Sequence, residues 1–298
     1  MDKIHTGKIL DEANGFEIID CIDCRFIHAS MSQSSDIYTS HYYDEEKPNY
    51  IASNESETEW WDLTYGDRID FADELVGKSL QSWIDIGTGP GLFLDAARKR
   101  NKEIIGLEPS IQASNHARSK GHNVINGYLD SESSLNLGLF DAAHFSEVLE
   151  HVPDPEDFLM NVRNVLNTNG LIVITVPNDY NPLQQAFTKD SSKEKWWLAP
   201  PFHLNYFSHK SLASLVKRCG FEVLESTSMF PIDLVLLRGD DYIGNDEIGK
   251  KAHSRRKNFE TKLAKENIVL LRNLYKAFAN LEIGREVVLY ARKIDHCL

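Results

Sequence analysis

The sequence has few cysteines, no long apolar run and a deficit of positive charge. Its four cysteines agree with a reducing compartment rather than with a disulfide-stapled secreted domain. No apolar run approaches the roughly eighteen residues of a membrane span, so we expect no membrane partner. The first residues lack a basic segment followed by an apolar one, which predicts no secretory signal and a cytoplasmic location.

Basic side chains are outnumbered, 32 against 45 acidic ones, which gives a formal net charge of -13. This balance argues against nucleic acid or an anionic membrane as the main partner. A local basic cluster can still hold a small anion, so a small-molecule acceptor is the partner we expect, and homodimer formation stays open. With 298 residues and 42% hydrophobic content, the chain can bury a large core. We expect one large domain with additional segments.

What the sequence does contain is a glycine-rich turn between a strand pattern and a helix pattern. Residues 82–86 are typical of a buried strand, and a helix is predicted from Leu92. Between them stand Gly87, Gly89 and Gly91, which let the backbone bend sharply and approach a ligand. A dinucleotide fingerprint would place its third glycine where Leu92 stands, so a nicotinamide cofactor is disfavoured. A plain tight turn is the other interpretation.

Acidic residues follow the next two predicted strands. Residues 103–108 form a buried strand ending in Glu108, whose carboxylate can accept from both hydroxyls of a ribose. The alternative is an acidic residue that opens the helix after Pro109. A third strand, residues 123–128, precedes Asp130, which either accepts from an adenine amine or caps the turn that follows it.

Further along the chain, residues 140–178 read FDAAHFSEVLEHVPDPEDFLMNVRNVLNTNGLIVITVPN. Together with the D-x-G-x-G-x-G motif that begins at Asp85, this stretch resembles the type 11/12/23 class I S-adenosylmethionine (SAM)-dependent methyltransferases. The resemblance spans most of residues 82–229. It implies an α/β fold with a Rossmann-like seven-stranded sheet, SAM as cofactor and methyl transfer as the activity.

The cofactor-binding residues favoured by the motifs and the resemblance are Asp85, Gly87, Thr88, Gly89, Gly91, Glu108, Pro109, Asp130, Ser146 and Glu147. Residues 59–75 carry a helical apolar pattern just before the glycine turn. On this helix and upstream of it, Tyr43, Trp61 or Arg68 is expected to cover the amino-acid end of the cofactor, and we count Tyr43 and Arg68 as cofactor-binding.

Two groups of residues raise the question of a metal. Some relatives with a Glu-x-x-Glu-His cluster, here residues 147–151, are reported to bind magnesium, but magnesium prefers oxygen ligands and the histidine argues against it. Cys21 and Cys24 form a C-x-x-C turn between predicted strands at 16–21 and 25–28. Zinc needs four ligands, and with His28 only three are apparent. We therefore expect a metal-free hairpin and no metal elsewhere.

The segment from 179 to 207 is polar and marked by prolines, and we expect an irregular substrate loop. Within it, aromatic residues surround His203. An imidazole is near its own pKa at neutral pH, so His203 is the candidate general base, with Tyr206 beside it as a substrate contact. The alternative is a histidine that holds the loop in place.

More than fifty residues separate the sixth strand from the last one, residues 285–292. Residues 247–281 are helical by periodicity and carry a basic cluster, from which we name His253, Arg255 and Arg256 as substrate-binding. The stretch 239–260 resembles an insertion in methyltransferases found with bacterial surface-polysaccharide genes, which implies a sugar-like or nucleotide-linked acceptor. A solvated helix face or a dimer contact is the alternative.

These inferences divide the chain into four parts. Residues 1–58 form an N-terminal hairpin and cap segment, 59–231 the SAM-binding core, 232–284 a helical insertion, and 285–298 the last core strand and tail. The expected activity is O-methylation of a small sugar-like or phosphorylated acceptor, which fits carbohydrate modification. N- or C-methylation of a metabolite and a non-catalytic SAM-binding subunit are the alternatives.

Overall fold

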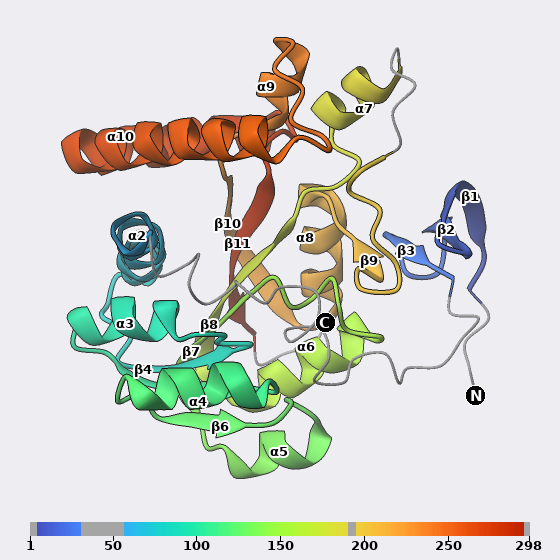
Figure 1. The fold of residues 1–298 in the computed structure, drawn as a ribbon. Coiled ribbons are helices and arrows are strands. Elements are labelled where there is room, and N and C mark those ends of the chain that lie inside the picture. The colour runs from blue at the N-terminus through green and yellow to red at the C-terminus, as the bar shows by residue number, and fades with distance from the viewer. Residues whose placement is uncertain (1–4, 31–56, 190–194, 295–298) are drawn as a thin grey trace.

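The computed structural model describes residues 5–30, 57–189 and 195–294 (Figure 1). A seven-stranded sheet in the order β10-β11-β8-β7-β4-β5-β6 forms its centre. The strands are β4 (Ser82–Ile86), β5 (Glu103–Glu108), β6 (Val124–Asn126), β7 (Phe140–Ser146), β8 (Leu166–Pro177), β10 (Phe221–Ser228) and β11 (Glu286–Lys293). The predicted seven-stranded α/β sheet is confirmed.

The order of the strands creates a switch point at β4. From β4 the chain moves outward through β5 to β6, and then returns to pair β7 on the other side of β4, all in parallel. In sheets of this kind, ligands bind beyond the carboxyl ends of the strands where the winding direction reverses. β11 lies between β8 and β10 and is antiparallel to both.

Helices cover both faces of this sheet because alternate residues of each strand point to opposite sides. Ile84 and Ile86 of β4 pack in a core with α6 (Pro155–Asn164) and α8 (His209–Arg218). Trp83 points the other way, into a core shared with α2 (Thr58–Val76) and α3 (Leu92–Lys99). α4 (Ile111–Ser119) and α5 (Ser131–Asn136) follow β5 and β6. The sheet is therefore buried between two layers of helices.

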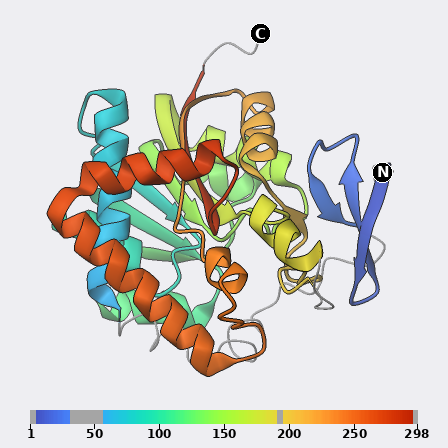
Figure 2. The ribbon, with the colours of Figure 1, turned by 90° about the horizontal axis from the view of Figure 1, so that it is seen from above.

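A second, smaller sheet stands on the side of the molecule away from α2 (Figures 1 and 2). It is antiparallel, with the order β1 (Gly7–Ala13), β2 (Phe16–Cys21), β3 (Ile27–Ala29) and β9 (Asn205–Tyr206). The sequence predicted β2 and β3 but neither β1 nor β9. Since β9 comes from the segment after β8, the second sheet joins the N-terminal hairpin to the expected substrate loop.

That loop is more regular than predicted, because it contains β9 and also α7 (Pro182–Lys189). The insertion between β10 and β11 holds α9 (Asp233–Leu237) and α10 (Asp246–Asn280), so the predicted long helix is confirmed. α10 lies beside α2 (Figure 2). In the ranges that the structure describes, no helix has both the length and the apolarity of a membrane span.

Candidate functional site

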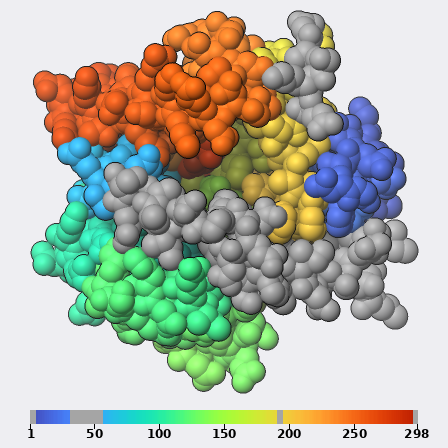
Figure 3. Space-filling model, viewed as in Figure 1, coloured from blue at the N-terminus to red at the C-terminus, as the bar shows by residue number. Residues whose placement is uncertain are grey.

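A pocket of about 160 Å³ lies at the carboxyl ends of β4 and β7. Its walls come from α2, the glycine turn, the residues after β7, the loop before β9, and β11. Figure 3 shows this side of the molecule, hollowed between α10, α2 and the segment around 195–207. Among the predicted site residues, those that line the pocket are Arg68, Asp85, Gly87, Thr88, Ser146, Glu147 and His203. One pocket thus brings cofactor and base candidates together.

The glycine turn has a backbone that other residues rarely adopt. Gly87, Gly89 and Gly91 have φ angles of 74°, 53° and 85°, all in the left-handed region that favours glycine. A Cβ on Gly87 would also lie 2.5 Å from Cγ2 of Val148. Gly87 therefore needs to be glycine for two independent reasons, and the turn can carry its backbone close to the pocket.

Asp85 holds the shape of this turn. One carboxylate oxygen accepts from the Thr88 hydroxyl at 2.5 Å, and the other accepts from Nδ1 of His144 at 2.7 Å. Burial lowers the pKa of His144, whose ring stacks on Phe93 at 3.7 Å between centroids. No local sequence pattern indicates this role of His144, because its partner lies 59 positions away.

Glu108 lies at the end of β5, as predicted, but it is fully buried and does not line the pocket. Its two oxygens accept from the backbone N–H groups of Gly89 at 2.7 Å and Ser110 at 2.8 Å. Burial raises the pKa of Glu108 to about 7, although both hydrogen bonds act in the opposite direction. Each carboxylate oxygen has a second acceptor position, so these two bonds do not use the full acceptor capacity of Glu108.

Asp130 and Pro109 also lie away from the pocket lining. Asp130 is the N-cap of α5 and accepts from the N–H groups of Glu132 at 3.0 Å and Ser133 at 2.7 Å. The structure thus shows the capping role that the sequence left open. The carbonyl of Pro109 accepts from the Asn126 amide at 3.0 Å, which ties the turn after β5 to β6.

Arg68 is a buried cation at the pocket wall, only 4% exposed. Its Nη2 lies 3.4 Å from the Met229 sulfur and 3.8 Å from a Glu286 oxygen, and its guanidinium faces the Tyr65 ring. Nη1 is buried without a hydrogen-bond partner among the described residues. A buried donor of this kind fits an anionic group of a ligand. Tyr43, the other predicted cover of the cofactor, lies outside the described residues.

Two histidines of the pocket lining are in contact with each other. The rings of His203 and His151 are edge to face, with centroids 4.9 Å apart. Nδ1 of His151 donates to the carbonyl of Phe202 at 2.8 Å, which anchors the loop that carries His203. Behind them, burial and the neighbouring Glu147 raise the pKa of Glu150 well above its usual range.

Ligand atoms of Glu150, His151 and His203 lie within 4.8 Å of one another. Glu147, part of the sequence cluster considered for magnesium, does not belong to this group. The set combines one carboxylate with two imidazoles, unlike the oxygen ligands that magnesium prefers.

The residues predicted to bind the acceptor lie elsewhere. Tyr206 is 2% exposed in the core of the small sheet, and its hydroxyl donates to the His203 carbonyl at 3.0 Å, a position that fits a scaffold. Arg256 is buried over the Trp60 ring, whereas Arg255 is exposed; both line a second pocket of about 400 Å³ that shares no lining residue with the first. His253 is half-buried, and burial together with nearby arginines lowers its pKa to about 3.

The sequence model described as a methyltransferase domain (Methyltransf_23) matches residues 38–226. A ubiquinone biosynthesis O-methyltransferase of Actinobacillus pleuropneumoniae is 26% identical over 142 residues, 40% of this chain and 59% of the relative. One of Vibrio vulnificus is 28% identical over 152 residues, 44% of this chain and 63% of the relative. The chain thus spans less than two thirds of the length of these curated relatives.

Solved structures resemble the fold at low sequence identity. The plantazolicin methyltransferase BpumL in complex with SAH has a TM-score of 0.52 and 15% identity, covering 85% of this chain and 93% of that chain. A chain in the complex between the Haloferax volcanii Trm112 methyltransferase activator and the putative methyltransferase has a TM-score of 0.53 and 16% identity. That match covers 87% of this chain and 99% of the other.

Proposed function

The chain belongs to the methyltransferase domain family, with SAM as its cofactor, and we propose that it methylates a hydroxyl oxygen of a small acceptor with His203 as the general base. One observation carries this proposal: His203 and the glycine turn line the same pocket. The curated relatives, named as O-methyltransferases, support oxygen as the methylated atom.

The residues present fit the cofactor. The turn at Gly87 has no room for a Cβ, and Nη1 of Arg68 is a buried donor without a partner among the described residues. We assign Arg68 to the methionine carboxylate, because a guanidinium and a carboxylate form short, charge-assisted hydrogen bonds. We assign Glu108 to the ribose, since its oxygens keep acceptor positions beside Gly89.

SAM supplies a methyl group made electrophilic by its sulfonium. The chain's own residues have three tasks: to align the acceptor, to exclude water and to remove the hydroxyl proton. His203 receives that proton, and His151 keeps the His203 loop in place through its bond to the Phe202 carbonyl. Alignment alone would suffice for an acceptor that is already ionised.

We further propose that the acceptor is sugar-like or phosphorylated. Arg255 supports this, because it is an exposed arginine beside Lys251 at the second pocket, and a guanidinium binds phosphate oxygens well. Labelled SAM assayed with matched phosphorylated and unphosphorylated alcohols and sugars tests the idea. Arg255→Ala should weaken only the phosphorylated acceptors, and an equal loss for both kinds would contradict the phosphate assignment.

His203→Ala is the decisive variant for the base. Turnover should fall roughly a hundredfold or more, while the affinity for S-adenosylhomocysteine and the melting temperature stay near those of the wild type. Calorimetry, thermal melts and single-turnover assays measure the three quantities. His116→Ala on α4, outside the pocket, is the control and should leave all of them unchanged. If the affinity for S-adenosylhomocysteine or the melting temperature fell in proportion to turnover, His203 would be a scaffold residue and not the base. A methyl recovered on nitrogen or carbon would overturn O-methylation.

A further inference from the structure

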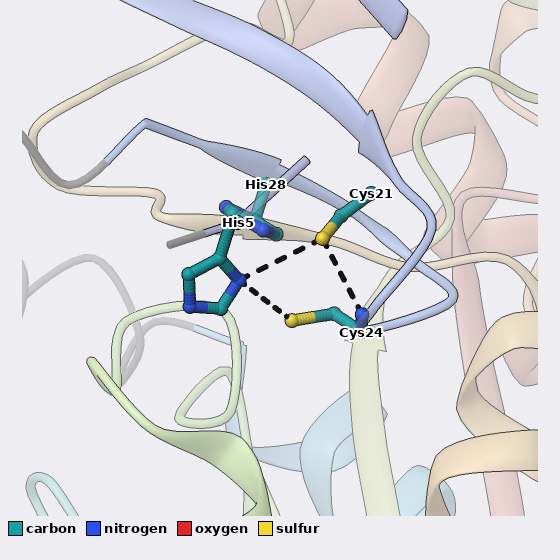
Figure 4. A group of neighbouring side chains, drawn as sticks. All are labelled: His5, Cys21, Cys24 and His28. Carbon is teal, nitrogen blue, oxygen red and sulfur yellow. Dashed lines mark hydrogen bonds between the residues drawn. The ribbon is translucent and has the colours of Figure 1, made fainter. Parts of the chain in front are cut away.

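Four side chains of the types that bind zinc meet at the turn between β2 and β3 (Figure 4). His5 precedes β1, Cys21 ends β2, Cys24 lies in the turn, and His28 is in β3. Ligand atoms of all four lie within 4.8 Å of one another. Nδ1 of His5 is 3.1 Å from Sγ of Cys24 and 3.6 Å from Sγ of Cys21. Ligand atoms around a tetrahedral zinc are about 3.3–3.8 Å apart, so only small movements are needed.

His28 is oriented as a metal ligand would be. Its Nδ1 donates to the backbone carbonyl of Ala29 at 2.8 Å, so Nε2 carries the lone pair. The residue is 5% exposed, and Nε2 has no hydrogen-bond partner within the described ranges. A buried acceptor without a donor is costly unless something binds it. The bond to Ala29 is also the type of outer contact that fixes the tautomer of a ligating histidine.

The turn favours a thiolate at Cys21. Both cysteines are free, and the backbone N–H of Cys24 points at Sγ of Cys21 at 3.3 Å. An N–H directed at sulfur stabilises the negative charge that a metal-bound thiolate carries. Two thiolates and two neutral imidazoles also balance the charge of a divalent ion.

We propose that His5, Cys21, Cys24 and His28 bind one zinc ion. A tetrahedral set of two sulfurs and two nitrogens suits zinc, and a site closed by four protein ligands is structural rather than catalytic. The sequence prediction of a metal-free hairpin rested on three ligands. The fourth, His5, stands 16 positions before Cys21, and only the folding of β1 against β2 brings it there.

The site supports the loop that carries His203. His28 pairs with Asn205 of β9, and the N–H of Ala29 donates to the carbonyl of Leu204 at 2.8 Å. The N–H groups of Leu204 and Asn205 in turn donate to the carbonyl of Glu150 at 2.8 and 3.0 Å. Zinc would therefore fasten the small sheet beside the pocket. This role does not depend on which atom the enzyme methylates.

The test uses the full chain without an affinity tag, expressed with zinc and purified without chelators. Elemental analysis should find about one zinc per chain. Replacing zinc with cobalt(II) should give the visible bands of a tetrahedral site and a near-ultraviolet thiolate-to-cobalt band. Cys24→Ser and His5→Ala should lose most of the metal and lower the melting temperature.

Two control variants separate a loss of metal binding from a general loss of folded structure. His5→Cys keeps four ligands and should retain zinc, and Cys219→Ala, in the main core, should retain it as well. Wild-type protein without stoichiometric zinc and without the thiolate-to-cobalt band would overturn the proposal. So would a Cys21–Cys24 disulfide in freshly purified protein, or metal content unchanged in Cys24→Ser.

Discussion

At the scale of single residues, Arg68 offers the sharpest test of how the pocket holds its cofactor. Arg68→Met removes the buried charge and its unpartnered Nη1. Loss of a charge-assisted hydrogen bond costs about 1.5–3 kcal/mol, so affinity for S-adenosylhomocysteine should fall roughly tenfold to a hundredfold in calorimetry. Arg98→Met is the control, because Arg98 is exposed and pairs with Asp95 on α3. If Arg68→Met and the wild type bound S-adenosylhomocysteine equally well, Arg68 would not be a cofactor-binding residue.

Glu108 should make stability depend on pH. Its pKa is raised from 4.5 to about 7, so the folded state holds a proton that the unfolded state has released in this interval. The contribution is fully present below pH 4.5 and is lost as pH rises through 7, about 3 kcal/mol in total. Glu108→Gln cannot titrate, so the unfolding free energy of the wild type, measured relative to this variant, should fall over that range. Denaturant unfolding of both proteins at several pH values measures the difference; parallel pH curves would contradict it.

The sequence predicted the positions of residues in the fold best where the evidence was local. The three glycines and Glu108 stand within one strand-turn-helix unit and its neighbour, and their positions in the fold follow from strand patterns. By contrast, Asp85 and His144 are partners across 59 positions, and His5 reaches Cys21 only through the pairing of β1 with β2. Contacts of this kind depend on tertiary packing, which no local pattern contains.

At the scale of elements, α10 shows how the insertion is attached to the core. Glu260 is 3% exposed, accepts from Nε1 of Trp60 on α2 at 2.7 Å, and lies 3.9 Å from the buried Arg256. Periodicity predicted the helix but read Arg256 as a substrate contact, because a basic cluster looks the same on a buried face and on an exposed one. The kink was also missed: Asn267 has non-helical angles, and its side chain accepts from the N–H of Leu270.

Removing Glu260 should loosen this attachment. Glu260→Ala leaves Arg256 buried without its carboxylate and Trp60 without its acceptor, so the unfolding free energy should fall by about 3 kcal/mol or more. Lys265→Ala, on the same helix, breaks an ion pair with Glu59 in which both side chains are more than half exposed, and should cost about 1 kcal/mol or less. Chemical denaturation compares them, and similar losses for the two variants would show that the buried pair is not a major attachment.

At the scale of the whole molecule, the layers and strand order of the main sheet could be predicted, and the small sheet could not. Most of the main strands are separate apolar runs, whereas β6 and β10 are more polar, and the resemblance to a known family orders them. β1 has only partly buried and exposed residues, and β9 is two residues long, so neither carries a periodic signal. Tyr206 consequently looked like a residue of an open loop, whereas it lies in a core built from β2, β3, β9 and the segment just before β9.

The position of β11 has a consequence for how the chain is made. Residues 286–293 fill the space between β8 and β10, so these two strands have no direct pairing to each other. During synthesis, the ribosome must finish more than fifty further residues after β10 before this strand emerges. Until then β8 presents one unpaired edge, a surface to which other strands can add. The central sheet is therefore completed only after the whole insertion has been made, and a nascent chain stalled within the insertion would expose the unpaired, aggregation-prone edge of β8.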